Sequence, residues 1–216
     1  MRCTNRIWLT GEVIAEPVYK YATAKMRYYE MEIATTRLSG NKDIIPVSLR
    51  ESMIKRHMPQ VGERVHVTGH IRATVEADKA DGCNHLYLVA SAMELRAPVE
   101  DDEDNEVYVE GMIAREVMYH QTPFAREIAE TLLVVEGRNG WRNRIPVIAW
   151  GKNARVLATL EYGDFISARG RLQSRTFVKT LEDGSKVQRT IRELSIRQLD
   201  AAPPEEEDND EGGEEA

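Results

Sequence analysis

The stretch Asn5-Arg-Ile-Trp-Leu-Thr-Gly11 recurs as Asn105-Glu-Val-Tyr-Val-Glu-Gly111, one hundred positions further along a chain of 216 residues. Self-similarity over a long, fixed interval indicates a tandem duplication. We therefore predict two related domains, residues 1–99 and 107–200, joined by an acidic linker over residues 100–106. Later landmarks keep nearly the same interval: Ile45-Pro-Val47 returns as Ile145-Pro-Val147, and Val61-Gly-Glu63 followed by Gly69 returns as Tyr162-Gly-Asp164 followed by Gly170.

Each copy alternates apolar and polar residues in short runs, which is the period of half-buried β-strands. A short apolar helix is expected after the third run, over 52–58 in the first copy and from Asn153, as its N-cap, to Leu160 in the second. Five strands with one helix between strands three and four is the layout of an OB barrel. We predict an all-β chain of two tandem OB barrels. The strands expected in the second copy cover residues 107–116, 126–135, 144–150, 164–177 and 190–199.

Four glycines fall inside the expected strands, Gly11 and Gly111 in the first strands and Gly69 and Gly170 in the fourth. A small closed barrel bends its strands sharply, and a glycine there relieves the crowding of side chains. We expect all four to be structural.

The formal net charge of -7 is unevenly distributed. Residues 201–216 hold eight acids and no base, and residues 100–106 hold six more acids and no base, which leaves 22 acids against 29 bases elsewhere. A basic body with acidic appendages suits a polyanionic ligand, for which the tail would compete. The alternative is that the tail only confers solubility. Its acidic composition, with Pro203 and Pro204, predicts disorder.

Arginines and aromatic residues share one strand face in the second copy. Alternation turns Phe177 and nearby arginines away from the core face of the fourth strand, and it places Trp150 opposite the core face of the third. Guanidinium groups bind phosphates while aromatic rings stack on bases, so this pattern favours a single-stranded DNA ligand over an ordinary solvated strand. The candidate DNA-binding residues are Trp141, Arg142, Arg144, Trp150, Lys152, Arg169, Arg171, Arg175, Phe177 and Lys179.

The run Ile145-Pro-Val-Ile-Ala-Trp-Gly-Lys152 and the run from Gly163 to Phe177 resemble the core of the bacterial single-stranded DNA-binding protein family. In that family an aromatic residue before Gly-Lys and another closing the Gly-x-Leu-x-x-Arg-x strand stack on bases, which implies these roles for Trp150 and Phe177. Members usually present four OB domains, which implies a homodimer of this chain. Common members also end in a Pro-Phe tip that docks on replication and repair enzymes; this tail ends in Ala216 without one.

The first copy resembles the family less, with Leu49 where Trp150 stands and Glu76 where Phe177 stands. It has its own aromatic and basic cluster around the first two expected strands. Two interpretations stay open: the cluster contacts DNA, or its tyrosines fill the barrel rim or a subunit contact. Its members are Tyr19, Lys20, Tyr21, Lys25, Arg27, Tyr28 and Tyr29.

Other classes of protein find little support. Cys3 and Cys83 form no CxxC pair and are expected as free thiols, and the five histidines are scattered, so we expect no metal, cofactor or catalysis. No apolar run approaches the ~20 residues that span a bilayer, and we expect a soluble cytoplasmic protein. The remaining alternatives are a primosome component, an RNA-binding OB protein, or a chain whose first barrel serves only assembly.

Overall fold

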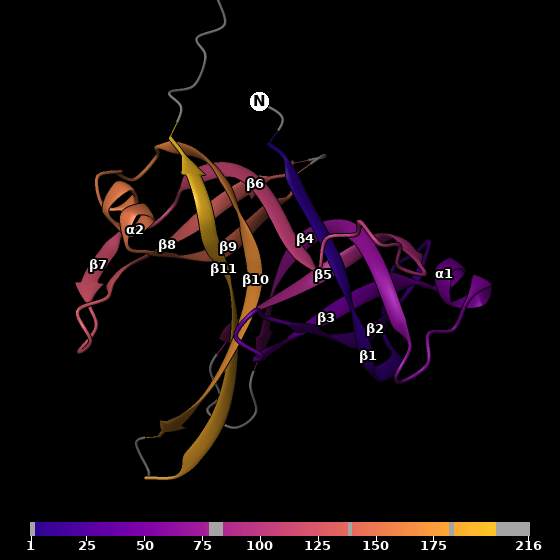
Figure 1. Cartoon of the computed structure of the whole chain (residues 1–216). Coiled ribbons are helices and arrows are strands. Elements are labelled where there is room, and N and C mark those ends of the chain that lie inside the picture. Colours follow the sequence, from indigo (N-terminus) through magenta and orange to yellow (C-terminus); the bar gives the residue numbers. More distant parts are fainter. Residues whose placement is uncertain (1–2, 78–83, 138–139, 182–183, 202–216) are drawn as a thin grey trace, which may run out of the picture.

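The computed structural model describes residues 3–77, 84–137, 140–181 and 184–201 (Figure 1). Cys83 and the acidic tail from residue 202 onward lie outside the described residues. The described chain is built almost entirely of strands, with two helices of six residues each. Neither described helix is long and apolar enough to cross a membrane.

The first OB barrel closes because its first strand pairs on both sides. In this barrel β1 pairs with β2 and with β4, while β3 and β5 run parallel and complete the circle. The predicted helix lies between strands three and four, as expected. The elements are β1 (Asn5–Ala22), β2 (Arg27–Thr36), β3 (Lys42–Arg50), α1 (Glu51–Arg56), β4 (Arg64–Ala77) and β5 (Asn84–Arg96).

The second barrel repeats this topology with one interruption. Its first strand ends at Ile113, and an additional short strand, β7, pairs with β8. All four residues of β7 are exposed, so no apolar alternation could reveal it. The elements are β6 (Asn105–Ile113), β7 (Met118–Gln121), β8 (Glu127–Glu136), β9 (Arg142–Trp150), α2 (Lys152–Leu157), β10 (Phe165–Thr180) and β11 (Lys186–Asp200).

The two cores confirm the duplication. Ile45 and Val47 are fully buried in β3, and Ile145 and Val147 are buried at the matching places in β9. The first four residues of β3 and of β9 alternate between exposed and buried, as expected for the strands predicted from alternation.

The expected capping of the second helix is wrong. Gly151 stands at the N-cap with a φ of 53°, a left-handed conformation that glycine adopts without strain. Asn153 lies inside α2, where its side chain donates a hydrogen bond of 2.8 Å to the carbonyl of Arg197.

The barrels are joined edge to edge, because β1 pairs antiparallel with β6 and all the strands form one continuous sheet (Figure 1). The predicted linker is therefore partly wrong: Asn105 and Glu106 already belong to β6 and are buried. Asp102 is also fixed, by an ion pair of 2.6 Å with Arg96. These acids belong to the folded body.

The charge argument needs a matching correction. When only the eight acids of residues 201–216 are set aside, the body has 28 acids against 29 bases. It is close to neutral rather than strongly basic. Any attraction for a polyanion must therefore come from local clusters of cations rather than from net charge.

A long hairpin projects from the second barrel. Strand β10 pairs with β6 only as far as Gly170, and β11 pairs with β9 from Leu194 onward. The rest of the two strands continues as a two-stranded ribbon that extends past the second barrel (Figure 1). We call residues 174–181 and 184–192 the arm.

Candidate nucleic-acid interface

Trp150 ends β9 on the face turned away from the core. Its neighbour Ala149 is fully buried, whereas 40% of the Trp150 side chain is exposed. Arg144 is exposed on the same face of β9, six residues earlier. Trp150 forms one wall of a shallow pocket whose other lining residues are Ala125, Arg126, Glu127 and Gly151.

The other wall of this pocket contains residues that the sequence interpretation missed. Phe124 precedes the pocket residue Ala125 and is 88% exposed, and Arg126 follows it. Both lie in the tight connection between β7 and β8. Ala125 has a φ of 55°, so the backbone turns sharply here. Arg126 therefore lines the same pocket as Trp150, and Phe124 is exposed in the turn next to it.

Glu127 lines the Trp150 pocket and is held there by two hydrogen bonds. Its carboxylate accepts hydrogen bonds from the hydroxyl of Tyr119 (2.8 Å) and from Arg155 (2.6 Å), and these bonds lower the pKa of Glu127. The repeat offered a signal for this hairpin, because the interval of one hundred maps Tyr19 of the predicted first cluster onto Tyr119.

Phe177 lies on the arm, with 39% of its side chain exposed. The guanidinium carbon of Arg175 is 5.9 Å from the centre of its ring, a cation–π distance. Lys179 is exposed further along the same strand. An aromatic ring and a cation are thus presented together on the arm.

The sequence analysis grouped Trp150 and Phe177 in one binding face. In the structure, the two rings do not form one stacking surface. Strands β9 and β10 are not neighbours, because β11 lies between them. Ala149, the neighbour of Trp150, pairs with Ile196, and Phe177 pairs with Arg189; these two partners are seven positions apart on β11, about 23 Å at ~3.3 Å per residue. They form two separate sites.

Three of the predicted DNA-binding cations form ion pairs with carboxylates of the protein itself. Arg171 binds Asp43 of the first barrel, whose side chain is fully buried. Arg169 pairs with Glu106 at 3.1 Å, and Arg142 makes a surface pair with Glu136 at 3.0 Å. Among the described candidate cations of the second barrel, Arg144, Lys152 and Arg175 have no carboxylate partner. Trp141 is exposed just before β9.

The strand register corrects the comparison between the copies. Trp150 pairs with Ile128, whereas Arg50 pairs with Tyr28 at the matching place of the first barrel. Leu49 is fully buried and corresponds to Ala149. Arg50, not Leu49, therefore stands where Trp150 stands, and the aromatic ring of the first barrel lies on the opposite strand.

The tyrosines of the first barrel contact one another. The rings of Tyr21 and Tyr28 stack at 4.9 Å, and Arg72 donates a bond of 2.6 Å to the Tyr21 hydroxyl. Tyr19 meets Tyr29 edge-on at 6.0 Å and stays exposed. The cations differ: Lys20 pairs with Glu30 and Glu76, Arg27 lies 3.8 Å from Glu51, and Lys25 is exposed.

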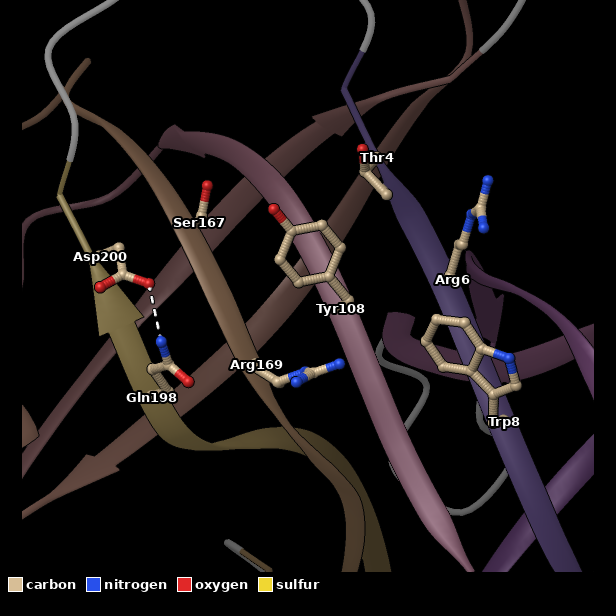
Figure 2. Close-up of a pocket in the computed structure, with 8 residues that line it drawn as sticks. All are labelled: Thr4, Arg6, Trp8, Tyr108, Ser167, Arg169, Gln198 and Asp200. Atoms are coloured by element: carbon tan, nitrogen blue, oxygen red, sulfur yellow. Dashed lines mark hydrogen bonds between the residues drawn. The ribbon is translucent and has the colours of Figure 1, made fainter. Parts of the chain in front are cut away.

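A second pocket spans the junction of the barrels (Figure 2). Arg6 and Trp8 of β1 face it from the first barrel, and Tyr108 of β6 lies between them and β10. Arg169 lines this pocket, so the structure separates it from the Trp150 site. The remaining lining residues are Thr4, Ser167, Gln198 and Asp200.

Solved structures show the same fold. The wild-type single-stranded DNA binding protein from Thermus aquaticus matches with a TM-score of 0.67 and 19% identity, over 94% of this chain and 94% of that chain. A deletion mutant of that protein matches with a TM-score of 0.68 and 20% identity, over 95% and 99%. No protein-family model matches the chain, and no curated protein matches it significantly in sequence.

The chain is thus a tandem OB-fold protein that shares the fold of the Thermus aquaticus structures over nearly its whole length. The fold implied by the run around Trp150 and by the run ending at Phe177 is confirmed.

Proposed function

We propose that this protein binds single-stranded DNA, without catalysing a reaction, along the second barrel from the Trp150 pocket to the arm. One observation carries the proposal: an exposed aromatic ring lies beside a cation at two places, Trp150 with Arg126 in one pocket, and Phe177 with Arg175 on the arm. Rings that stack on bases, with cations for the phosphates between them, are the usual components of a single-strand site.

The separation of the two places favours an extended ligand. A distance of about 23 Å is longer than one nucleotide spans, so a strand of several nucleotides would connect Trp150 to Phe177. Lys152, two residues after Trp150, adds positive charge near that ring, and Arg144 is exposed on the same face of β9, about 20 Å away. Such a protein would cover and protect single strands during replication, recombination or repair.

The direct test is a fluorescence titration of the protein with oligo-dT, oligo-rU and a DNA duplex, at several lengths and two salt concentrations. We expect oligo-dT to bind most tightly, with an affinity that falls as salt rises. Tighter binding of oligo-rU would establish the RNA-binding alternative, and equal binding of the duplex would exclude a stacking site.

The cations make a separate prediction. Arg175→Gln should weaken binding and reduce the slope of log K against log salt by about 0.7, the value for one phosphate contact on a single strand. Arg169→Gln should leave that slope unchanged, because Arg169 is already paired with Glu106 at 3.1 Å. Titrations at four salt concentrations check both variants, and a reduced slope for Arg169→Gln would show that Arg169 also contacts a phosphate.

We also propose a homodimer that presents four OB barrels. The pocket at the junction contains Trp8, Tyr108 and Arg6, and residues of these kinds are enriched in the cores of protein interfaces. Light scattering should give a mass near twice 24.6 kDa. The mass of a single chain at micromolar concentration would contradict this assignment.

A further inference from the structure

A buried carboxylate of the first barrel lies at the centre of the contacts that hold the arm of the second. Asp43 of β3 is fully buried, and its oxygens accept two hydrogen bonds from Arg37, at 2.5 and 3.0 Å. The same carboxylate accepts a bond of 2.8 Å from the backbone N–H of Ser174 and is paired with Arg171, both on β10. Two groups of the second barrel thus converge on one acid of the first.

Ser174 uses all its polar groups in this contact. Its carbonyl accepts a bond of 3.1 Å from Arg37, and its hydroxyl accepts one of 2.9 Å from the N–H of Ile44. Across the hairpin, Ser174 pairs with Arg192 of β11. Arg192 donates a bond of 3.1 Å to the carbonyl of Ile44. Both strands of the arm are therefore hydrogen-bonded to Ile44 of β3, through residues that pair with each other across the hairpin.

Arg192 also reaches other strands of the first barrel. Its guanidinium carbon lies 5.3 Å from the centre of the Tyr87 ring on β5, and it approaches Glu32 of β2 to 3.8 Å. The hydroxyl of Tyr87 donates a bond of 2.8 Å to Glu30, which fixes the ring.

The second barrel cannot orient the arm by itself. Beyond Gly170 strand β10 no longer pairs with β6, and before Leu194 strand β11 does not pair with β9. A two-stranded ribbon without further support is marginally stable in water. Phe177 lies three residues beyond Ser174, about 10 Å further along the ribbon. Its position therefore depends on the contact at Ser174.

We propose that Asp43 is a positioning residue for nucleic-acid binding: together with Arg37 it braces the arm, so that Phe177 and Arg175 meet the same strand that stacks on Trp150. This inference rests on the proposed function. It gives the first barrel a role that does not require that barrel to touch the ligand. Asp43 acts through Ser174 and Arg171 and has no contact with DNA.

A double-mutant cycle with oligo-dT long enough to span both sites tests this role. Phe177→Ala should weaken binding about tenfold in the wild-type background, but less than about twofold in an Asp43→Asn background, because an unbraced arm no longer places the ring. Trp150→Ala is the matched control, and its effect should be the same in both backgrounds. An equal effect of Phe177→Ala in both backgrounds would overturn the inference while leaving the proposed function intact.

A replacement variant and a hydrogen-exchange measurement cover the case in which Asp43→Asn does not fold. Asp43→Asn leaves Arg37 and Arg171 without their anion, so if this variant fails to fold, Arg171→Met replaces it in the same cycle with the same expected result. Hydrogen exchange of the arm amides should also accelerate in either variant while the barrel amides stay protected. Unchanged exchange in the arm would refute the brace. If neither Phe177→Ala nor Trp150→Ala weakens binding, the proposed site has failed instead.

Discussion

Trp150→Ala is expected to weaken the binding of oligo-dT by about 10- to 100-fold, because stacking on one aromatic side chain contributes ~1 to 3 kcal/mol. The residue ends its strand, 40% of its side chain is exposed, and the core residue beside it is Ala149. The substitution therefore removes a stacking surface and little of the core. Fluorescence anisotropy with a labelled oligonucleotide measures the change.

Two controls sharpen this result. Trp150→Phe keeps an aromatic face and should retain most of the affinity. Tyr162→Ala removes a ring that is 76% exposed, in the connection between α2 and β10 and away from the residues that line the Trp150 pocket. It should bind like the wild type. Equal losses for Tyr162→Ala and Trp150→Ala would mean that binding does not depend on the Trp150 pocket.

Gly170→Ala is expected to cause the largest loss of stability, about 3 kcal/mol or more. A Cβ at this position would lie 2.1 Å from the carbonyl oxygen of Ser195 and 3.1 Å from the Cα of Ile196. All the obstructing atoms are backbone, so β10 and β11 would have to separate where the second barrel closes. Urea denaturation measures the change in the free energy of unfolding.

The control for this experiment is Gly137→Ala. A Cβ there would lie 3.5 Å from the nearest atom, the carbonyl oxygen of Trp141, which is ordinary contact. It should change the free energy of unfolding by less than about 1 kcal/mol. Equal stability of Gly170→Ala and the wild type would show that the barrel tolerates a wider strand spacing than the structure has.

The repeat and the alternation of apolar residues were sufficient to predict both barrels. Buried positions such as Ile45 and Ile145 return at the same interval in the chain and at the same depth in the structure. The structural role of the four strand glycines was also predicted, but the crowding they relieve comes first from backbone: the nearest atom to a new Cβ at Gly11 would be the carbonyl oxygen of Ala34, at 2.5 Å.

Long-range contacts could not be predicted in the same way. The partner of Arg171 is Asp43, 128 positions away in the other domain, and nothing in the local pattern links them. Phe124 lies in a turn, where no periodicity distinguishes an exposed ring from a buried one. The linker acids were interpreted as solvated appendages because composition does not reveal that Glu106 belongs to a strand that pairs with β1.

The central claim is that a single strand lies across the second barrel, from the Trp150 pocket to the arm. Photocrosslinking with an oligonucleotide that carries bromodeoxyuridine at every position, followed by mass spectrometry of the crosslinked peptides, tests it most directly. We predict crosslinks at Trp150, Phe124 and Phe177, suppressed by an excess of unlabelled oligo-dT. Crosslinks confined to the tyrosines of the first barrel, such as Tyr19 and Tyr28, would contradict the claim.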